Sequence, residues 1–160
     1  MNGGLKIKVS VHISINVIKL LKMIIDKYKC IFVHIAKCGG CSMNIISRDN
    51  DTIPTCHSTI NEIHSKFPHV KDYFSFAFVR NPWARLVSGF SMWKNMSDTH
   101  SWSQWDSKEM DFCKNYNFKD FIYAVKINHI VKDHTQPYIG HYFEKPSDMN
   151  FIGKLEQYQD

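Results

Sequence analysis

The sequence predicts an α/β fold with a central parallel sheet. Three short hydrophobic runs carry this prediction, at residues 30–35, 73–79 and 150–153. The first run has no polar alternation, which suits a strand buried on both faces of a parallel sheet. Helical patterns lie between the runs, and strands that alternate with helices are typical of parallel sheets.

Turn and capping residues mark the helices of this pattern. Asn81-Pro82 begins one helix, because proline is favoured at the first helical position. Its expected buried face comprises Trp83, Leu86, Val87, Phe90 and Trp93. Thr59 and Glu62 form a capping-box pattern for a short helix that Pro68 ends. Further helices are expected at residues 42–47 and 118–127, and an inserted loop region at 95–117.

The amino-terminal segment shows a different pattern. Residues 7–17 alternate between apolar β-branched and polar side chains, which predicts a strand. Apolar residues then recur at helical spacing over residues 17–28. We therefore expect an appendage at residues 1–26, made of a strand and an amphipathic helix, and a main domain at residues 27–160.

Composition limits the classes of partner. The formal net charge of +5 suits an anionic ligand, but no long run of lysine or arginine predicts nucleic-acid binding. The longest apolar stretch, residues 9–21, is interrupted by polar side chains, so we expect no membrane association and a cytoplasmic location. An odd, scattered set of cysteines argues against a disulfide framework: Cys30, Cys38, Cys41, Cys56 and Cys113.

A glycine pair follows the first predicted strand. Lys37, Gly39 and Gly40 lie between this strand and the next helix. Glycines let the backbone approach an anion, and the N–H groups at the helix start point toward it. This loop lacks the order of residues in a Walker A motif, because the lysine precedes the glycines. An ordinary turn between strand and helix is the alternative interpretation.

Arg80 and Ser88 form a second candidate site. Arg80 lies at the carboxyl end of the second predicted strand, where α/β proteins place ligand contacts. Ser88 lies two turns into the following helix, so the guanidinium and the hydroxyl can hold one phosphate between them. The alternatives are a surface salt bridge for Arg80 and close helix packing for Ser88.

Three segments together resemble one enzyme family. They read IFVHIAKCGGCSM, FAFVRNPWARLVSGF and NFIGKLEQYQD. Their sequences and order are similar to those of sulfotransferases that use 3′-phosphoadenosine 5′-phosphosulfate (PAPS), in particular the carbohydrate branch that includes heparan-sulfate 2-O-like enzymes. The resemblance implies a P-loop-like, three-layer α/β fold with a central parallel sheet flanked by helices. It also implies sulfuryl transfer from PAPS, without a metal, to a hydroxyl of a carbohydrate-like acceptor.

The resemblance assigns roles to individual residues. Arg80 and Ser88 correspond to the residues that hold the 3′ phosphate of PAPS. The residues that correspond to the 5′-phosphosulfate loop are Lys37, Cys38, Gly39, Gly40, Cys41 and Ser42. Cys38 and Cys41 replace the usual threonines, and a thiol is the weaker hydrogen-bond donor.

Histidine suits the role of the base that accepts the hydroxyl proton, because it titrates near neutrality. His57 matches the position of a family histidine between the two nucleotide motifs, so we expect His57 and Lys37 to be catalytic. An exposed loop histidine is the alternative for His57. His34 is expected to pack in the core, and His134 with Gln136 resembles an acceptor-side segment.

Other functions also fit parts of the pattern. Cys38 and Cys41 form a C-x-x-C pair, which can act in redox chemistry or bind zinc, but neither function explains Arg80. Family members usually continue beyond the position of Asp160, so we expect a domain truncated at its carboxyl end. A truncated, inactive PAPS-binding or interaction domain is therefore the main alternative, and an ATP-dependent kinase is a third.

Overall fold

The computed structural model describes residues 22–40, 42–43, 52–54, 57–100, 106–130 and 134–157. The strand expected at residues 7–17, Cys41 and most of the helix expected at 42–47 lie outside the described residues. These expectations stay predictions.

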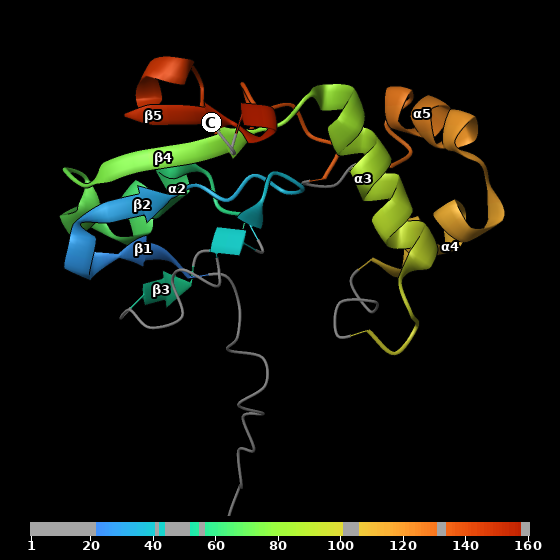
Figure 1. Ribbon diagram of the computed structural model, residues 1–160, viewed down its shortest axis with the longest axis horizontal. Coiled ribbons are helices and arrows are strands. Elements are labelled where there is room, and N and C mark those ends of the chain that lie inside the picture. Colours follow the sequence, from blue (N-terminus) through green and yellow to red (C-terminus); the bar gives the residue numbers. More distant parts are fainter. Residues whose placement is uncertain are drawn as a thin grey trace, which may run out of the picture.

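Five described strands form one mixed sheet (Figure 1). They are β1 (Lys22–Ile25), β2 (Cys30–Phe32), β3 (Thr52–Pro54), β4 (Phe74–Val79) and β5 (Phe151–Lys154), in the spatial order β3-β1-β2-β4-β5. The three predicted strands β2, β4 and β5 are parallel to one another. The α/β class is thus confirmed. The sheet is not wholly parallel, because β1 runs antiparallel to both β2 and β3.

The helix expected at residues 17–28 is wrong over its described part. Lys22–Ile25 is a strand, followed by a 3-10 turn at Asp26–Tyr28 and a left-handed Lys29 (φ 47°) that leads into β2. Ile24 and Ile25 are both buried, so they lack the alternation that marks a half-exposed strand. The sheet therefore includes Lys22–Ile25, which the expected boundary at residue 26 assigns to the appendage.

Four described α-helices accompany the sheet: α2 (Ile60–Lys66), α3 (Pro82–Asn95), α4 (Ser107–Asn115) and α5 (Phe118–Lys126). The capping box of α2 is formed by Thr59 and Glu62, and Asn81 caps α3 ahead of Pro82, as predicted. The loop expected at 95–117 is wrong in its second half, where α4 lies. That helix is mostly polar, and its three buried residues, Glu109, Met110 and Cys113, pack against α3.

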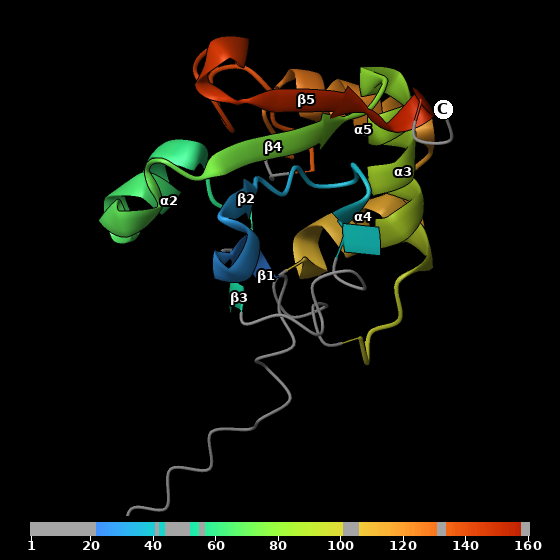
Figure 2. The same cartoon turned by 60° about the vertical axis from the view of Figure 1, so that its left-hand side comes forward.

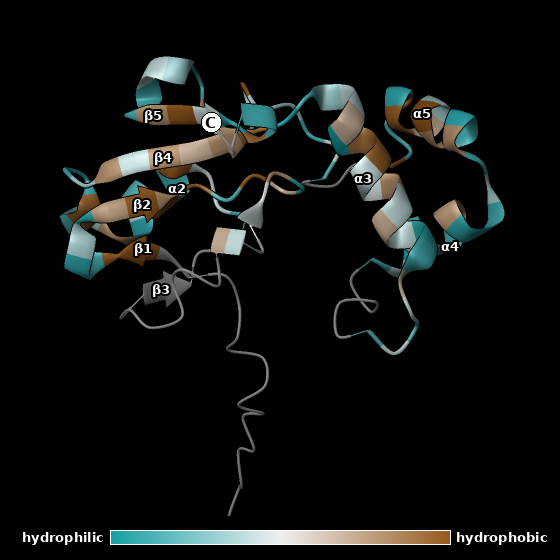
Figure 3. Cartoon of the chain, in the orientation of Figure 1, coloured by the Kyte–Doolittle hydropathy of each residue, from teal (hydrophilic) through white to brown (hydrophobic). Residues whose placement is uncertain are grey.

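The described chain has two large hydrophobic cores and a small hydrophobic cluster around Phe32. The first joins one face of the sheet to α2 and to the segment at 138–149, with Ile31, Ile63 and Tyr142 at its centre. The second lies between α3, α4 and α5 around Trp93 and Phe121. Figure 1 shows these three helices beyond the end of the sheet to which β4 leads, and in the turned view of Figure 2 α3 again lies past that end. Hydrophobic residues dominate the strands and alternate with polar ones along the helices (Figure 3).

The buried face of α3 differs from the prediction. Arg85, Gly89 and Trp93 are its buried residues, whereas Trp83 is 68% exposed and Val87 is 49% exposed. The apolar pattern alone predicted that Trp83 and Val87 face the core. The observed rotation of α3 instead buries Arg85 between the two cores, because that side chain finds hydrogen-bond acceptors there.

The position of Ile24 allows a direct test of β1. Ile24→Ala should lower the free energy of unfolding by about 2–5 kcal/mol, because it removes a fully buried side chain from the core. Tyr28→Ala, at a residue that is 60% exposed, is the control and should change stability by less than about 0.5 kcal/mol. Urea denaturation measures both. Equal, small effects would show that β1 is dispensable for the core.

Candidate functional site

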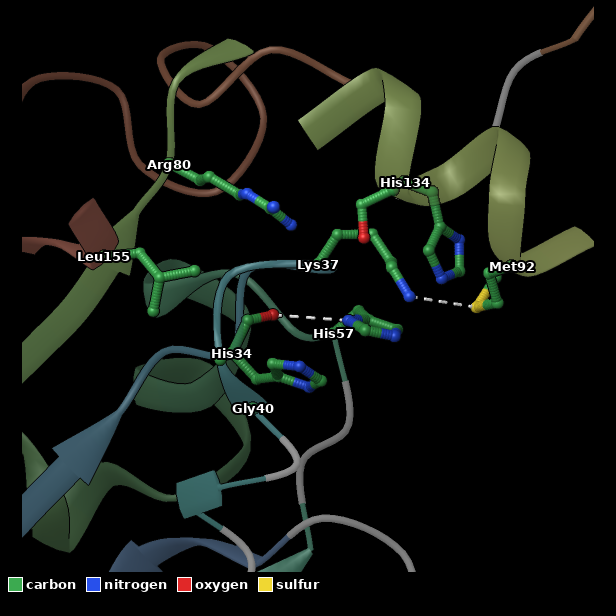
Figure 4. A pocket seen from close by; sticks show the side chains of 10 residues that line it. His34, Lys37, Gly40, His57, Arg80, Met92, His134 and Leu155 are labelled. Carbon is green, nitrogen blue, oxygen red and sulfur yellow. Dashed lines mark hydrogen bonds between the residues drawn. The ribbon is translucent and has the colours of Figure 1, made fainter. Parts of the chain in front are cut away.

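A pocket of about 300 Å³ opens where the carboxyl ends of β2 and β4 meet α3 (Figure 4). It lies between the two hydrophobic cores and draws side chains from five segments. Its lining consists of His34, Lys37, Gly39, Gly40, His57, Arg80, Ser88, Met92, His134 and Leu155. Six residues predicted to form the site, Lys37, Gly39, Gly40, His57, Arg80 and Ser88, therefore line one pocket. No aspartate or glutamate is among these lining residues.

The loop after β2 has an unusual backbone. Lys37 adopts a left-handed conformation (φ 65°), which is uncommon for a residue with a side chain, and so does Gly39 (φ 86°). A Cβ on Gly40 would lie 1.9 Å from Nε2 of His34, so only glycine fits there. The N–H groups of Gly39 and Gly40 make no hydrogen bond to another described residue. They are therefore available to an anion.

Lys37 reaches across the pocket toward α3. Its Nζ lies 3.3 Å from Sδ of Met92 and donates a hydrogen bond to it. A thioether is a weak hydrogen-bond acceptor. Figure 4 shows the lysine side chain between Arg80 and the histidines, in the middle of the pocket.

The backbone around Arg80 is firmly held, whereas its side chain is not. The hydroxyl of Tyr138 donates to the Arg80 carbonyl at 2.5 Å and lies 3.3 Å from the Arg80 nitrogen, which donates to it. Glu156 accepts the Asn81 N–H at 2.6 Å, and this bond, helped by nearby Arg80, lowers the pKa of the Glu156 carboxyl. Within the described chain, the Arg80 guanidinium makes no hydrogen bond or ion pair. The Ser88 hydroxyl makes none either.

Three histidines lie together on the other side of Lys37. The ring centroids of His34 and His57 are 4.5 Å apart, and those of His57 and His134 are 5.6 Å apart. Nδ1 of His57 lies 3.3 Å from the His34 carbonyl oxygen. Because a carbonyl can only accept, this bond places a hydrogen on Nδ1 and leaves Nε2 of a neutral His57 as the basic atom. His134 packs against Trp93 at a centroid distance of 5.1 Å.

Cys38 and Ser42 do not line the pocket. Cys38 is a fully buried free thiol, and its Sγ lies 3.8 Å from the Tyr138 hydroxyl within the first core. The Cys38 side chain thus points into the first core and away from the pocket lining, and its expected role in donor binding stays a prediction. Ser42 is exposed, and its N–H bonds to the Gly39 carbonyl at 3.0 Å. Cys41 lies outside the described residues.

Arg85 is the main residue that the sequence analysis missed. It is 4% exposed, and its Nε donates to the Ala36 carbonyl at 2.9 Å, while Nη1 donates to the Gln136 carbonyl at 2.5 Å. Its guanidinium also lies 4.9 Å from the centroid of the Tyr138 ring. One side chain thus joins the loop after β2, α3 and the segment that carries His134. The sequence feature that could have pointed to Arg85 is its place as a charged residue beside the apolar positions of α3.

His34, Met92 and Leu155 were also not predicted to line the pocket. His34 is buried as expected, but it lies beyond the end of β2 and faces Gly40 rather than a purely apolar core. Across the described ranges, no cluster of three or more His, Cys, Asp and Glu side chains is arranged to hold a metal ion. Among the helices described, none is both long and apolar enough to cross a bilayer.

The comparison with protein families agrees with this architecture. The sequence model of the sulfotransferase family matches residues 22–160. This range contains all five described strands, β1 among them, and every residue that lines the pocket. The chain therefore belongs to the sulfotransferase family, a class of enzymes that transfer sulfuryl groups. Neither the curated proteins nor the solved structures contain a significant match.

The bridge made by Arg85 predicts a large effect from a conservative change. Arg85→Lys keeps the charge but cannot reach both carbonyl oxygens with a planar fork, so it should lower the free energy of unfolding by about 1–3 kcal/mol. The reverse change Lys94→Arg, on the exposed face of the same helix, is the control and should be nearly neutral. Thermal denaturation compares the two. If Arg85→Lys left the free energy of unfolding unchanged, the bridge between the two carbonyls would not contribute to stability.

Proposed function

We propose that this protein transfers a sulfuryl group from PAPS to a hydroxyl group of a carbohydrate-like acceptor. The observation that carries the proposal is the pocket itself. It gathers two cationic side chains, two open backbone N–H groups, a serine hydroxyl and a histidine with a basic Nε2 in about 300 Å³. PAPS has two phosphate-bearing ends that need positive or N–H groups, and the acceptor alcohol needs a base to take its proton. The pocket residues can supply both.

The two ends of PAPS fit two parts of the pocket. The 5′-phosphosulfate would lie on the N–H groups of Gly39 and Gly40 beside Lys37, since an anion there gains several hydrogen bonds at once. The 3′ phosphate would lie between Arg80 and Ser88, whose side chains have no hydrogen bond to another described residue. This second position favours PAPS over ATP, because ATP has no 3′ phosphate.

The same residues support a direct transfer. The acceptor oxygen would attack sulfur, the bond from sulfur to the bridging phosphate oxygen would break, and adenosine 3′,5′-bisphosphate (PAP) would leave. Nε2 of His57 would take the hydroxyl proton. Lys37 would stabilise the negative charge that develops on the bridging oxygen. The bond from His57 to the His34 carbonyl supports this role, because it holds the ring with Nε2 unprotonated.

The acceptor would approach from the side of His57 and His134. The motifs that resemble carbohydrate sulfotransferases support a glycan hydroxyl, of the heparan-sulfate 2-O-like type, as the acceptor. Isothermal calorimetry with PAP and with ATP tests the donor, and turnover of labelled PAPS on a panel of hydroxylated glycans tests the reaction. Tighter binding of ATP than of PAP would contradict the proposal. PAP binding without turnover on any acceptor would instead indicate an inactive donor-binding domain.

Arg80→Ala should specifically weaken the binding of ligands that carry a 3′ phosphate. The change removes a charge-assisted contact, so PAP binding should weaken by roughly 10- to 100-fold. Binding of adenosine 5′-phosphosulfate, which has no 3′ phosphate, should hardly change. Lys119→Ala, on α5, also removes one positive charge and should affect neither ligand. Equal losses for both ligands in Arg80→Ala would exclude a specific role.

His57→Ala should separate binding from turnover. A base acts on the acceptor, so the variant should keep the PAP affinity of the wild type and lose turnover by on the order of 10²- to 10⁴-fold. His69→Ala, an exposed histidine beyond the same helix α2, is the matched control and should keep full turnover. Unchanged turnover in His57→Ala would reject this base and make His134 the next candidate.

A further inference from the structure

His34 is a buried imidazole at the floor of the pocket. Its side chain is 7% exposed, and it lines the pocket together with Lys37 and Gly40. Nδ1 is completely buried and has no hydrogen-bond partner among the described residues, so a ligand in the pocket cannot reach it. Nε2 makes no hydrogen bond to another described residue either, and it is therefore the ring nitrogen that can contact a ligand atom in the pocket.

The position of the His34 ring is closely defined. The ring stacks on Phe32 at a centroid distance of 6.0 Å and lies tilted against His57 at a centroid distance of 4.5 Å. Nε2 lies against Gly40, since a Cβ there would come within 1.9 Å of it. This nitrogen therefore lies against Gly40, in the loop whose N–H groups would hold an anion.

The charge state of His34 determines what its ring can do. Burial is the largest of the effects that together lower the pKa of His34 to about 3, and the neighbouring His57, His134 and Lys37 act in the same direction. The ring is therefore neutral at physiological pH. A neutral imidazole carries one N–H donor, and phosphate or sulfate oxygens only accept hydrogen bonds. The ring can contact such an anion only through that donor.

We propose that the His34 imidazole donates a hydrogen bond from Nε2 to the anionic group bound at the Lys37–Gly40 loop. This inference rests on the proposed function, in which that group is the 5′-phosphosulfate of PAPS. His34 is then a donor-contacting residue that adds a hydrogen bond without adding a third positive charge beside Lys37 and Arg80. Gly40 is required because any side chain there would displace the ring.

His34→Phe tests the contact. Phenylalanine keeps a flat ring against Phe32 and His57 but has no N–H. The variant should bind PAP roughly tenfold more weakly, as expected for one lost hydrogen bond to a charged group. It should bind adenosine 3′-monophosphate, which has no 5′ phosphate, as well as the wild type does. Arg80→Ala should weaken both ligands, so the two variants give different patterns.

The pH dependence of PAP binding shows whether His34 acts as a neutral hydrogen-bond donor or as a cation. The charged and titratable groups that face His34 are His57, His134, Lys37 and Arg80, and all are present in both proteins. The ratio of PAP affinities between wild type and His34→Phe should therefore stay constant from pH 6 to pH 8. A ratio that grows as the pH falls would show that His34 binds as a cation and would overturn the proposal.

The remaining outcomes are also decisive. Equal losses for PAP and adenosine 3′-monophosphate in His34→Phe would show a structural role only. If the variant does not fold, NMR of the wild type replaces it: the His34 ring N–H should shift with PAP and not with adenosine 3′-monophosphate. Absence of that difference overturns the inference. A wild type that does not bind PAP overturns the proposed function itself, whereas binding that His34→Phe leaves unchanged overturns only the role of His34.

Discussion

The buried guanidinium of Arg85 is the interaction on which the site depends. It lies between the two hydrophobic cores, donates to the carbonyls of Ala36 and Gln136, and rests on the ring of Tyr138. Ala36 directly precedes Lys37, Tyr138 holds the backbone of Arg80, and Gln136 follows His134 by two residues. The bridge thus connects α3, which packs in the second core, to the loop before Lys37 and the segment at 136–142, which pack in the first. The cost of burying the charge is offset only while each N–H keeps its acceptor.

The pocket that results is strongly cationic. Lys37 and Arg80 both line it, and no lining residue is acidic. Two positive side chains in one pocket favour a dianionic or trianionic ligand over a neutral one. The strained backbone of Lys37 is consistent with a loop that is shaped for ligand binding.

The histidines next to these cations have separate environments and therefore separate roles. His34 is buried and neutral, and its carbonyl oxygen orients His57. His57 is less buried than His34, and in the proposed mechanism its Nε2 takes the hydroxyl proton. An anionic donor beside Lys37 would also favour uptake of a proton by a neighbouring histidine, which links donor binding to base function through simple electrostatics.

The sequence by itself determined the local features. The apolar runs of β2, β4 and β5, the caps of α2 and α3, and the spacing of Lys37, Gly39, Gly40, Arg80 and Ser88 all follow from short-range preferences, which depend on neighbouring residues. Only the tertiary structure decided which face of α3 is buried, that Lys22–Ile25 is a strand, that Cys38 points into the core, and that Arg85 and His34 belong to the site. Each of these depends on partners far away in the chain: Ile24 pairs with Ile31 and Ile53, Cys38 meets Tyr138, and Arg85 bonds to Ala36 and Gln136. Local periodicity cannot show such partners, because it does not record which segments meet in space.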